Sequence, residues 1–373
     1  MKQDGSLSDI GLGWLEGTGA HSDIVLSTRV RLARNLQGHA FSSRVRDGER
    51  EEILQRVRAA VSHMPGLSAG SSYELAAMSP LARRVLHERH LVSRELAGLA
   101  GEEPPRGAGL FMGPRDALGI MVNEEDHLRL QAILSGLRLH EAFHQVDELD
   151  EELGGQLPFA YHHEYGYLTS CPTNVGTGLR ASILIHLPGL VLTKEIGKVL
   201  QGIGQVGLTF RGLYGEGSEV VGNFFQISNQ TTLGKSEEDL VEHLQKIVSR
   251  VIQYEAAARE VLMRDAPTVI EDKIWRAYGL LRYARSLSFD EVMNLLSGVR
   301  LGMSMNLLSG LRVYTLNKIM IYAQDAHLEQ AAGRELLDAE SDLHRASYVR
   351  RVLAAEGDVS ADGAGAAGDT ETS

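Results

Sequence analysis

The sequence predicts an α+β fold in the first part of the chain and an all-helical domain in the C-terminal part. Apolar and polar residues alternate with a period of two in several segments before residue 231, which is typical of β-strands. Segments with helical periodicity lie between them. Beyond Pro267 the period-two pattern disappears, and apolar residues recur only at helical spacing. This change places a domain boundary near residues 255–268.

The predicted elements follow from these two periods. In the first strand Arg29 and Arg31 lie on one face, whereas Ile24, Leu26, Thr28, Val30 and Leu32 lie on the other. Ser79-Pro80 is a typical helix start, because serine caps a helix and proline suits its first turn. We expect further strands near 108–112, 118–133, 158–169, 179–185, 207–219 and 221–230. We expect helices at 47–63, from Ser79 onward, and at 136–153, 191–203, 236–264, 269–285, 289–299, 310–330 and 338–355.

The composition restricts the class of protein. Hydrophobic residues make up 43% of the 373 residues, which is ordinary for a globular protein, and no apolar run is long enough to span a membrane. The N-terminus has no apolar signal-peptide core and one cysteine cannot form an intrachain disulfide, so we expect a cytoplasmic protein. A net charge of −12 argues against broad binding to nucleic acid. Residues 1–22 are expected to form an irregular or short helical N-terminal segment, called here the N-terminal lead. The acidic residues 357–373 are predicted to be disordered.

The single cysteine, Cys171, lies in a segment of unusual composition, TSCPTNVGTGLRAS. Pro172 fixes its own φ and has no N–H group, and Gly176 and Gly178 permit a tight turn. The turn leads into a strand on which Arg180 lies on the polar face. A thiol and a guanidinium therefore stand at the two ends of one glycine-rich turn.

Five arginines on predicted strands or turns come from four separate segments of the chain. Guanidinium groups bind phosphate oxygens in a bidentate manner and more rigidly than lysine does. Such a set of cations indicates an anionic ligand, because like charges held side by side repel one another. The five residues are Arg29, Arg31, Arg129, Arg180 and Arg211.

Two carboxylates, Glu125 and Glu216, lie close in sequence to Arg129 and Arg211. Phosphoryl transfer requires mainly positioning and charge neutralisation, which arginines and Mg²⁺ can supply. A guanidinium acceptor is a poor nucleophile near neutral pH, because its pKa exceeds about 12. Two carboxylates can hold its planar N–H groups, and one can withdraw a proton as attack begins. These residues, with a Cys171 thiolate as a third acceptor, predict transfer of the ATP γ-phosphoryl group to a guanidino nitrogen.

Two other motifs point to different chemistry. His140-Glu-Ala-Phe-His144 matches the H-E-x-x-H pattern of zinc hydrolases, but both histidines fall on the polar face of the predicted helix. We therefore expect no zinc site there. Gly234-Lys235-Ser236 matches the end of a P-loop, yet Asn229 stands where the first glycine is required, and Ser236 can instead cap the following helix.

Four motifs resemble, in the same order, the signatures of the phosphagen (guanidino) kinases: STRVRLARN, NEEDHLR, CPTNVGTGLRAS and RG-x-x-GE. Within that superfamily the chain resembles the bacterial protein arginine kinases, through GYLTSCPTNVGTGLRAS and RGLYGEGSEVVGNFFQISNQ. The resemblance implies a glutamine-synthetase-like catalytic domain at 23–256, with a mostly antiparallel sheet flanked by helices. It also implies an all-α dimerisation and regulatory domain at 257–356. Because STRVR begins at Ser27, we expect no helical N-terminal domain of the kind that encloses small substrates in other members.

The resemblance also implies roles for individual residues. Glu125 and Glu216 would bind the substrate guanidinium, with Glu125 favoured as general base, and Cys171 would be a supporting contact. Mg²⁺ would arrive on ATP rather than on protein ligands. The nucleotide would be held by Ser27, Thr28, Arg29, Val30, Arg31, His90, Arg129, Arg180, Ala181, Ser182, Ile183, Leu184, Arg211, Gly212, Leu213, Tyr214, Gly215 and Glu216.

The bacterial protein arginine kinases carry an R-D-x-x-R-A motif that forms a regulatory phosphoarginine pocket. Here Asp342, Arg345 and Ala346 match it, but Ser341 replaces the first arginine, so we expect a weakened or repurposed pocket. The resemblance further implies a homodimer and a zinc-finger activator protein. It implies protein substrates with exposed arginines, among them a heat-shock repressor, and delivery of marked proteins to an unfoldase and protease.

Three alternatives remain open at this point. The chain could phosphorylate free arginine or another small guanidino compound. It could be a zinc hydrolase acting through His140 and His144. It could also be a phosphoarginine-binding adaptor without catalysis, although Glu125, Glu216 and Cys171 argue against that.

Overall fold

The computed structural model describes residues 12–41, 44–101, 103–212 and 220–357. Its centre is an eight-stranded sheet in which every described pair of neighbouring strands is antiparallel. Across the sheet the order is β2 (Ser71–Glu74), β3 (Gly109–Met112), β4 (Leu118–Val122), β5 (Leu128–Ser135), β1 (Val25–Arg34), β8 (Leu179–His186), β10 (Phe224–Asn229) and β9 (Leu208–Arg211). A separate hairpin pairs β6 (Tyr161–His162) with β7 (Gly166–Tyr167). The predicted α+β class is confirmed.

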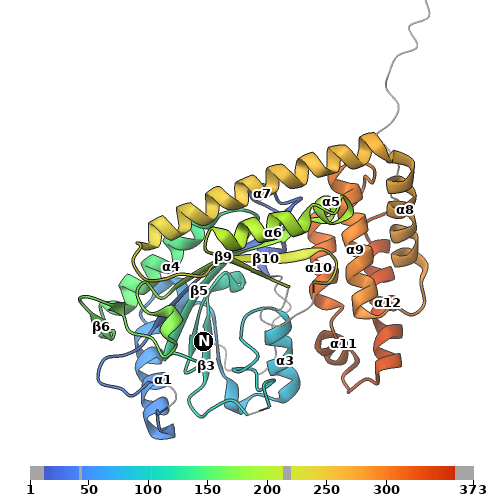
Figure 1. Cartoon of the computed structure of the whole chain (residues 1–373). Coiled ribbons are helices and arrows are strands. Elements are labelled where there is room, and N and C mark those ends of the chain that lie inside the picture. The colour runs from blue at the N-terminus through green and yellow to red at the C-terminus, as the bar shows by residue number, and fades with distance from the viewer. Residues whose placement is uncertain (1–11, 42–43, 102, 213–219, 358–373) are drawn as a thin grey trace, which may run out of the picture.

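Helices cover one face of the sheet and bury its apolar residues. They are α1 (Asp47–Val61), α2 (Pro65–Ser68), α4 (Leu139–Gly154), α5 (Pro188–Leu192), α6 (Ile196–Gln205) and α7 (Glu237–Asp265). Val30, Ala181 and Ile183 from the central strands pack in this core against residues such as Val146 and Val248. Ser236 caps α7 through the Asp239 amide, as the sequence predicts. In Figure 1 this helix runs from above the sheet to the C-terminal helices.

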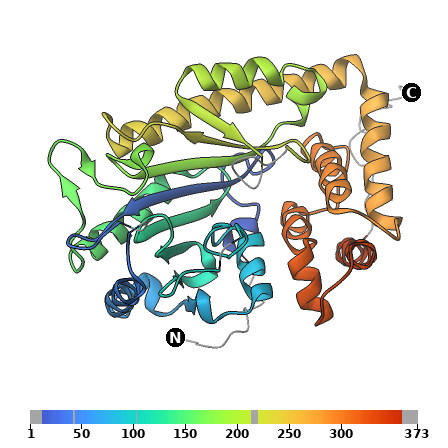
Figure 2. The same ribbon diagram turned by 60° about the horizontal axis from the view of Figure 1, so that its bottom comes forward.

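The C-terminal helices continue a second core that begins on the other face of the sheet. They are α8 (Pro267–Tyr283), α9 (Phe289–Ser304), α10 (Val313–Tyr322), α11 (Asp325–Ala332) and α12 (Asp338–Ala354). Leu110, Met121 and Ile133 of the sheet share this core with Val299 and Ile319 of the C-terminal helices. Two short elements, η1 (Gly13–Leu15) and α3 (Pro80–Glu88), lie between the sheet and these helices. Figure 2 shows the C-terminal helices beside the sheet.

The strand expected at 158–169 is the short hairpin of β6 and β7, because the chain turns back between them. Two other predicted elements are also divided in the structure. The strand expected at 118–133 is two strands, β4 and β5, joined by a tight turn in which Asn123 has a φ of 57°. The helix expected at 310–330 is two helices, α10 and α11, because the backbone of Gln324 is extended. In both cases the apolar pattern continues across the break, because the residues on each side face the same core.

A bulge in β1 reverses the predicted alternation at its start. The pairing of β1 with β8 shifts register between Val25 and Ser27. Val25 packs with Val30 in the core under the helices, but Leu26 packs in the second core. The prediction that Leu26 shares the face of Val30 is therefore wrong, since a bulge inserts one residue and restarts the period. Among the helices of the described ranges, none is both long and apolar enough to cross a membrane.

Candidate active site

One face of the central strands carries a row of arginines. Arg31 on β1 lies directly opposite Gln131 on β5 and Arg180 on β8. Arg29 lies opposite Ser182 on β8 in the same way. Directly opposed residues of an antiparallel pair point to the same face, so strands far apart in sequence place these guanidinium groups together. We call this surface, formed by Arg29, Arg31, Arg129 and Arg180, the arginine face.

The cations of the arginine face are half-buried and repel one another. Burial, with repulsion from Arg129, lowers the pKa of Arg29 to about 10. The pKa of Arg31 lies well below its ordinary value, because its guanidinium is partly withdrawn from water and because Arg29, Arg129 and Arg180 surround it. Among the described residues, the buried Nε atoms of Arg29 and Arg31 have no hydrogen-bond partner. Unpaired donors on crowded cations fit a polyanion such as the phosphates of ATP.

Arg129 joins the arginine face to two carboxylates. Its Nη1 lies 2.6 Å from one oxygen of Glu124, and its Nη2 donates to Oε2 of Glu125 at 2.9 Å. Burial acts to raise the pKa of Glu124, but Arg129, the Ser93 hydroxyl and the Glu125 amide outweigh it and hold the pKa below its usual value. Glu124 is only 4% exposed, whereas Glu125 is 44% exposed. Glu124 is therefore a buried counter-ion of Arg129, whereas the carboxylate of Glu125 pairs with the same arginine and is accessible from solvent.

The turn that carries these carboxylates has its own anchors. The amide of Asn123 donates to the carbonyl of His127 at 2.9 Å, so residues 123–127 form a turn rather than an extended strand. In an extended strand Glu125, His127 and Arg129 would share one face, but the turn takes His127 away from the other two. Its buried ring accepts a hydrogen bond from the Leu36 amide instead. Asp126 of the same turn accepts from the Asn35 side chain at 2.7 Å.

Asp126 also ties the carboxylate turn to the cysteine segment. Its Oδ1 accepts a hydrogen bond of 2.6 Å from the amide of Ser170, the residue before Cys171. The partly buried Cys171 lies 3.0 Å, from Sγ to Oγ1, from Thr173. Gly176 has a φ of 110°, and a Cβ atom there would lie 2.4 Å from the carbonyl oxygen of Thr232. Glycine is therefore required at this position, and the hydrogen bond from Ser170 to Asp126 joins the cysteine segment to the carboxylate turn.

A small cavity lies on the same sheet face, beyond Arg29. Its volume is about 30 Å³. Four of the predicted nucleotide residues line it, namely Ser27, Arg29, His90 and Ser182, and a fifth, Leu184, supplies an apolar wall. Trp14, Ile133 and Gln226, which the sequence did not single out, complete the lining. The predicted nucleotide residues therefore form a site with two ends. The cationic end lies at Arg31, and the mixed end, with polar and apolar side chains together, lies at this cavity.

Other residues of the predicted nucleotide set point away from the arginine face. Val30, Ala181 and Ile183 are buried in the core under the helices. The Thr28 hydroxyl donates to the carbonyl of Gly136 at 2.7 Å. A nucleotide on the arginine face cannot touch these four side chains, because alternate residues of a strand point to opposite faces. On β1 and β8, the predicted nucleotide residues whose side chains lie on the arginine face are Ser27, Arg29, Arg31, Arg180, Ser182 and Leu184.

The remaining predicted residues lie at the edge strand. Arg211 ends β9 and lies opposite Gln226 of β10, on the same sheet face as Leu184. Gly212 follows it and is buried. Leu213, Tyr214, Gly215 and Glu216 lie outside the described residues.

The protonation of His90 gives a pH prediction. Burial, with repulsion from Arg29 and His87, lowers the pKa of His90 to about 3, so the ring is neutral at pH 7. The unfolded chain binds the proton near pH 6.5, so this stability is present above pH 6.5 and is lost as the pH falls toward 3. We expect His90 to account for about 1 kcal/mol of lost unfolding free energy between pH 7.5 and 5.5. Urea unfolding of His90→Gln should show a pH dependence smaller by that amount, whereas the exposed control His144→Gln should not.

The H-E-x-x-H motif lies on the outer surface of α4. His140 and His144 are exposed, and His144 lies 3.4 Å from Glu148 on the same helix. In the described ranges, no group of three or more histidine, cysteine, aspartate and glutamate side chains is arranged to hold a metal ion. The surroundings of these histidines give no support to a zinc hydrolase.

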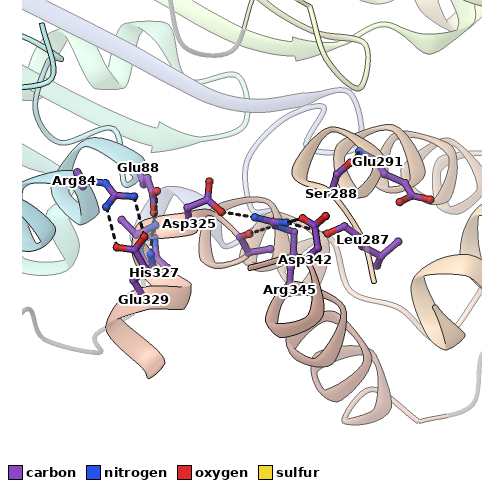
Figure 3. Close-up of polar contacts among 12 residues, drawn as sticks. Arg84, Glu88, Leu287, Ser288, Glu291, Asp325, His327, Glu329, Asp342 and Arg345 are labelled. Carbon is purple, nitrogen blue, oxygen red and sulfur yellow. Dashed lines mark hydrogen bonds and ion pairs between the residues drawn. The ribbon is translucent and has the colours of Figure 1, made fainter. Parts of the chain in front are cut away.

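Arg345 of the predicted regulatory pocket is saturated by its own chain, as Figure 3 shows. Its Nε donates to the carbonyl of Ala323 at 2.8 Å, and its Nη1 donates to the carbonyl of Leu287 at 2.9 Å. Asp342 and Asp325 accept its remaining strong bonds. Ser341 and Ala346 are buried nearby on α12. Arg345 therefore links α12 to α11 and to the segment before α9.

Three residues at the site are not among those predicted from the sequence. Glu124 precedes Glu125, and in an extended strand its side chain would point to the face opposite Arg129. Gln131 accepts a hydrogen bond of 2.5 Å from Arg29, and its position two residues after Arg129 could have indicated the shared face. Trp14 comes from the N-terminal lead, and no local pattern in the sequence connects it with the sheet.

Comparisons with known proteins agree with this geometry. Residues 52–258 match the family described as ATP:guanido phosphotransferase, C-terminal catalytic domain. Residues 267–363 match the family described as protein-arginine kinase McsB C-terminal domain.

Among solved structures, a taurocyamine kinase from Schistosoma mansoni with bound transition-state-analogue components is similar, with a TM-score of 0.59 and 29% identity. The match covers 68% of this chain and 35% of that one. A lombricine kinase matches with a TM-score of 0.57 and 26% identity, over 68% of this chain and 71% of that one. These matches support the antiparallel guanidino-kinase sheet.

Curated relatives are similar over nearly the whole length. The protein-arginine kinase of Moorella thermoacetica is 45% identical over 344 residues, which is 91% of this chain and 97% of that protein. The protein-arginine kinase of Geobacillus stearothermophilus is 45% identical over 346 residues, 92% of this chain and 94% of that protein. Since the matches extend over the catalytic sheet and the C-terminal helices alike, the chain belongs to the protein-arginine kinase family.

Proposed function

We propose that this protein transfers the γ-phosphoryl group of ATP to arginine side chains of other proteins. The observation that carries the proposal is the arginine face. There the buried Nε donors of Arg29 and Arg31 have no partner among the described residues, and the exposed carboxylate of Glu125 is held beside them by Arg129. A cage of this kind neutralises a transferred phosphoryl group, and a carboxylate beside it can receive the proton of a guanidinium.

The proposed reaction is a single in-line displacement. A guanidino nitrogen of the substrate forms a bond to the γ-phosphorus as the bond from that phosphorus to the β,γ-bridging oxygen breaks, and ADP leaves. The proton of the attacking nitrogen passes to Glu125. Arg29, Arg31, Arg129, Arg180 and Arg211 hold the phosphates, and Mg²⁺ bound to ATP adds further neutralisation. Glu216 also binds the substrate guanidinium, and Cys171 is a supporting contact to the same group.

The acceptor is proposed to be a protein rather than free arginine. The exposure of Glu125 supports this, because a side chain presented on a large partner can reach it from solvent. The names of the relatives in bacteria support it as well. The taurocyamine and lombricine kinases match less of the chain at lower identity, so they support the fold and not a small guanidino acceptor, which is the second candidate only by exclusion in the experiment below.

Mass spectrometry distinguishes the two candidates. The protein is incubated with MgATP and an arginine-rich protein, and phosphate sites are mapped under conditions that preserve acid-labile bonds. We expect phosphate on arginine, with free L-arginine turned over far more slowly. Efficient turnover of free arginine with an unlabelled protein would favour the small-molecule kinase. Label confined to serine, threonine or tyrosine would contradict both.

The wider setting is also part of the proposal. The catalytic part spans residues 23–256, and residues 257–356 serve dimerisation and regulation. The protein acts in the cytoplasm as a homodimer with a zinc-finger activator protein. Its substrates include a heat-shock repressor, and phosphoarginine delivers them to an unfoldase and protease in the stress response.

Regulation by phosphoarginine is proposed to be weak in this protein. The guanidinium of Arg345 already donates hydrogen bonds to the carboxylates of Asp325 and Asp342. Ser341 stands where the motif has an arginine and supplies no second positive charge. An incoming phosphoryl group would have to displace both carboxylates. We expect free phosphoarginine at millimolar concentration to change kcat/KM less than about twofold, because such like-charge competition offsets the new contacts. Asp325→Asn, which removes one competing charge, should respond more strongly, and a strong response of the unmodified protein would contradict the proposal.

A further inference from the structure

The segment at residues 12–24 crosses the sheet face that carries the arginines. Its first element, η1, packs against β1 and β5. Trp14 in η1 is only 1% exposed and lines the cavity together with Arg29, His90 and Leu184. A buried tryptophan thus reaches the mixed end of the candidate nucleotide site.

Trp14, which lines this cavity, carries an unused donor on its indole ring. Among the described residues its Nε1 has no hydrogen-bond partner, although the atom is buried. Leaving a buried N–H unpaired is unfavourable, so native structures usually supply a partner or a ligand. The ring lies edge-on to His90, with 5.8 Å between ring centroids. The two rings form one wall of the cavity.

The position of the cavity fits the nucleoside end of ATP. Along β1, Ser27 at the cavity is four residues from Arg31 at the cationic end, which corresponds to about 13 Å. The cavity holds about 30 Å³, enough for one polar group rather than a whole base. Leu184 offers an apolar surface beside it, whereas Arg31, Arg129 and Arg180 surround the other end. If the phosphates bind to the arginines, the nucleoside extends toward the cavity. A ribose hydroxyl or a base nitrogen can then accept a hydrogen bond from Trp14.

The C-terminal helices hold both rings in place. On the tryptophan side, Asn317 donates to the carbonyl of Leu15 at 2.9 Å, and Arg300 donates to the carbonyl of Ser22 at 2.6 Å. On the histidine side, the Glu88 carboxylate near His90 accepts the Ala326 amide at 2.8 Å and contacts His327 at 2.7 Å. Figure 3 shows this second link, with the Arg84–Glu329 ion pair beside it.

We propose that Trp14 is a further nucleotide-binding residue, whose indole N–H donates to the nucleoside of ATP, and that the C-terminal helices position it. The inference rests on the proposed function, since it takes the arginine face as the phosphate site. It gives the segment at residues 12–24 a role in binding the nucleoside, in addition to the phosphate binding by the arginines. It also gives the C-terminal helices a direct influence on the affinity for ATP.

The test uses the two tryptophans of the full-length chain. Trp14→Phe keeps an aromatic ring but removes the donor, and Trp275→Phe on α8 is the matched control. We expect Trp14→Phe to raise the KM for ATP by about five- to tenfold, the loss of one hydrogen bond, with kcat changed less than about twofold. The KM for the protein substrate should not change. Trp275→Phe should leave all three parameters unaltered.

Fluorescence gives an independent readout. In the Trp275→Phe protein Trp14 is the only tryptophan, and MgADP should change its emission in a saturable manner. An unchanged KM for ATP in Trp14→Phe, or no emission change while MgADP binding is detected by calorimetry, would overturn the inference and leave the proposed function standing. Absence of MgADP binding and of phosphoarginine formation in the unmodified protein would overturn both. If Trp14→Phe does not fold, the titration of Trp275→Phe decides.

Discussion

Replacement of Glu125 by glutamine is expected to lower the rate of arginine phosphorylation by about a thousandfold. Glutamine keeps the size of the side chain and can still lie beside Arg129, but it cannot take a proton from the attacking nitrogen. The affinity for MgATP should change little, because Glu124 continues to balance the charge of Arg129. Single-turnover phosphorylation of a protein substrate, combined with calorimetric titration of MgADP, separates the two effects.

The matched control for this experiment is Glu148→Gln. Glu148 is an exposed glutamate on α4 that pairs only with His144 on the same helix in the described structure. It should leave both phosphorylation and nucleotide affinity unchanged. Retention of more than about a tenth of the normal rate in Glu125→Gln would transfer the role of general base to another group, with Glu216 the first candidate.

Replacement of Arg31 by methionine is expected to separate stability from activity. Arg31 is a half-buried cation among three other guanidinium groups, so its removal relieves repulsion in the protein without nucleotide. Replacing a buried charge by an apolar side chain of similar length is often neutral or stabilising, and we expect a gain of about 1 kcal/mol in unfolding free energy. The same change removes a phosphate contact, so kcat/KM should fall by about a hundredfold or more.

Urea unfolding and steady-state kinetics on one preparation test both parts. The matched control is Arg276→Met on α8, where the arginine is 75% exposed and pairs with Asp272. That control should alter neither quantity by a large amount. If Arg31→Met is less stable, the guanidinium of Arg31 makes favourable contacts in the protein without nucleotide, contrary to this prediction. If its kinetics are near normal, Arg31 does not bind the phosphates.

The sequence predicted much of the fold because the relevant signals are local. The apolar stripe of α1, the Ser79 and Ser236 caps and the long α7 depend on residues within a few turns of one another. Predictions were wrong where a pattern passed through a break, as at Asn123 and Gln324. Period alone cannot detect a turn whose flanking strands face the same core, nor the bulge that turns Leu26 to the other side.

The sequence by itself determined which residue types are available: the five arginines, Glu125, the glycine-rich cysteine turn and the motif order that resembles the guanidino kinases. Only the tertiary structure decided which of them meet. Arg31 lies opposite Arg180 because of the pairing of β1 and β8, Glu124 turns to Arg129 because of a hairpin, and Trp14 arrives from the N-terminal lead. These contacts depend on hydrogen-bond register and packing between segments far apart in the chain, and no local period encodes them.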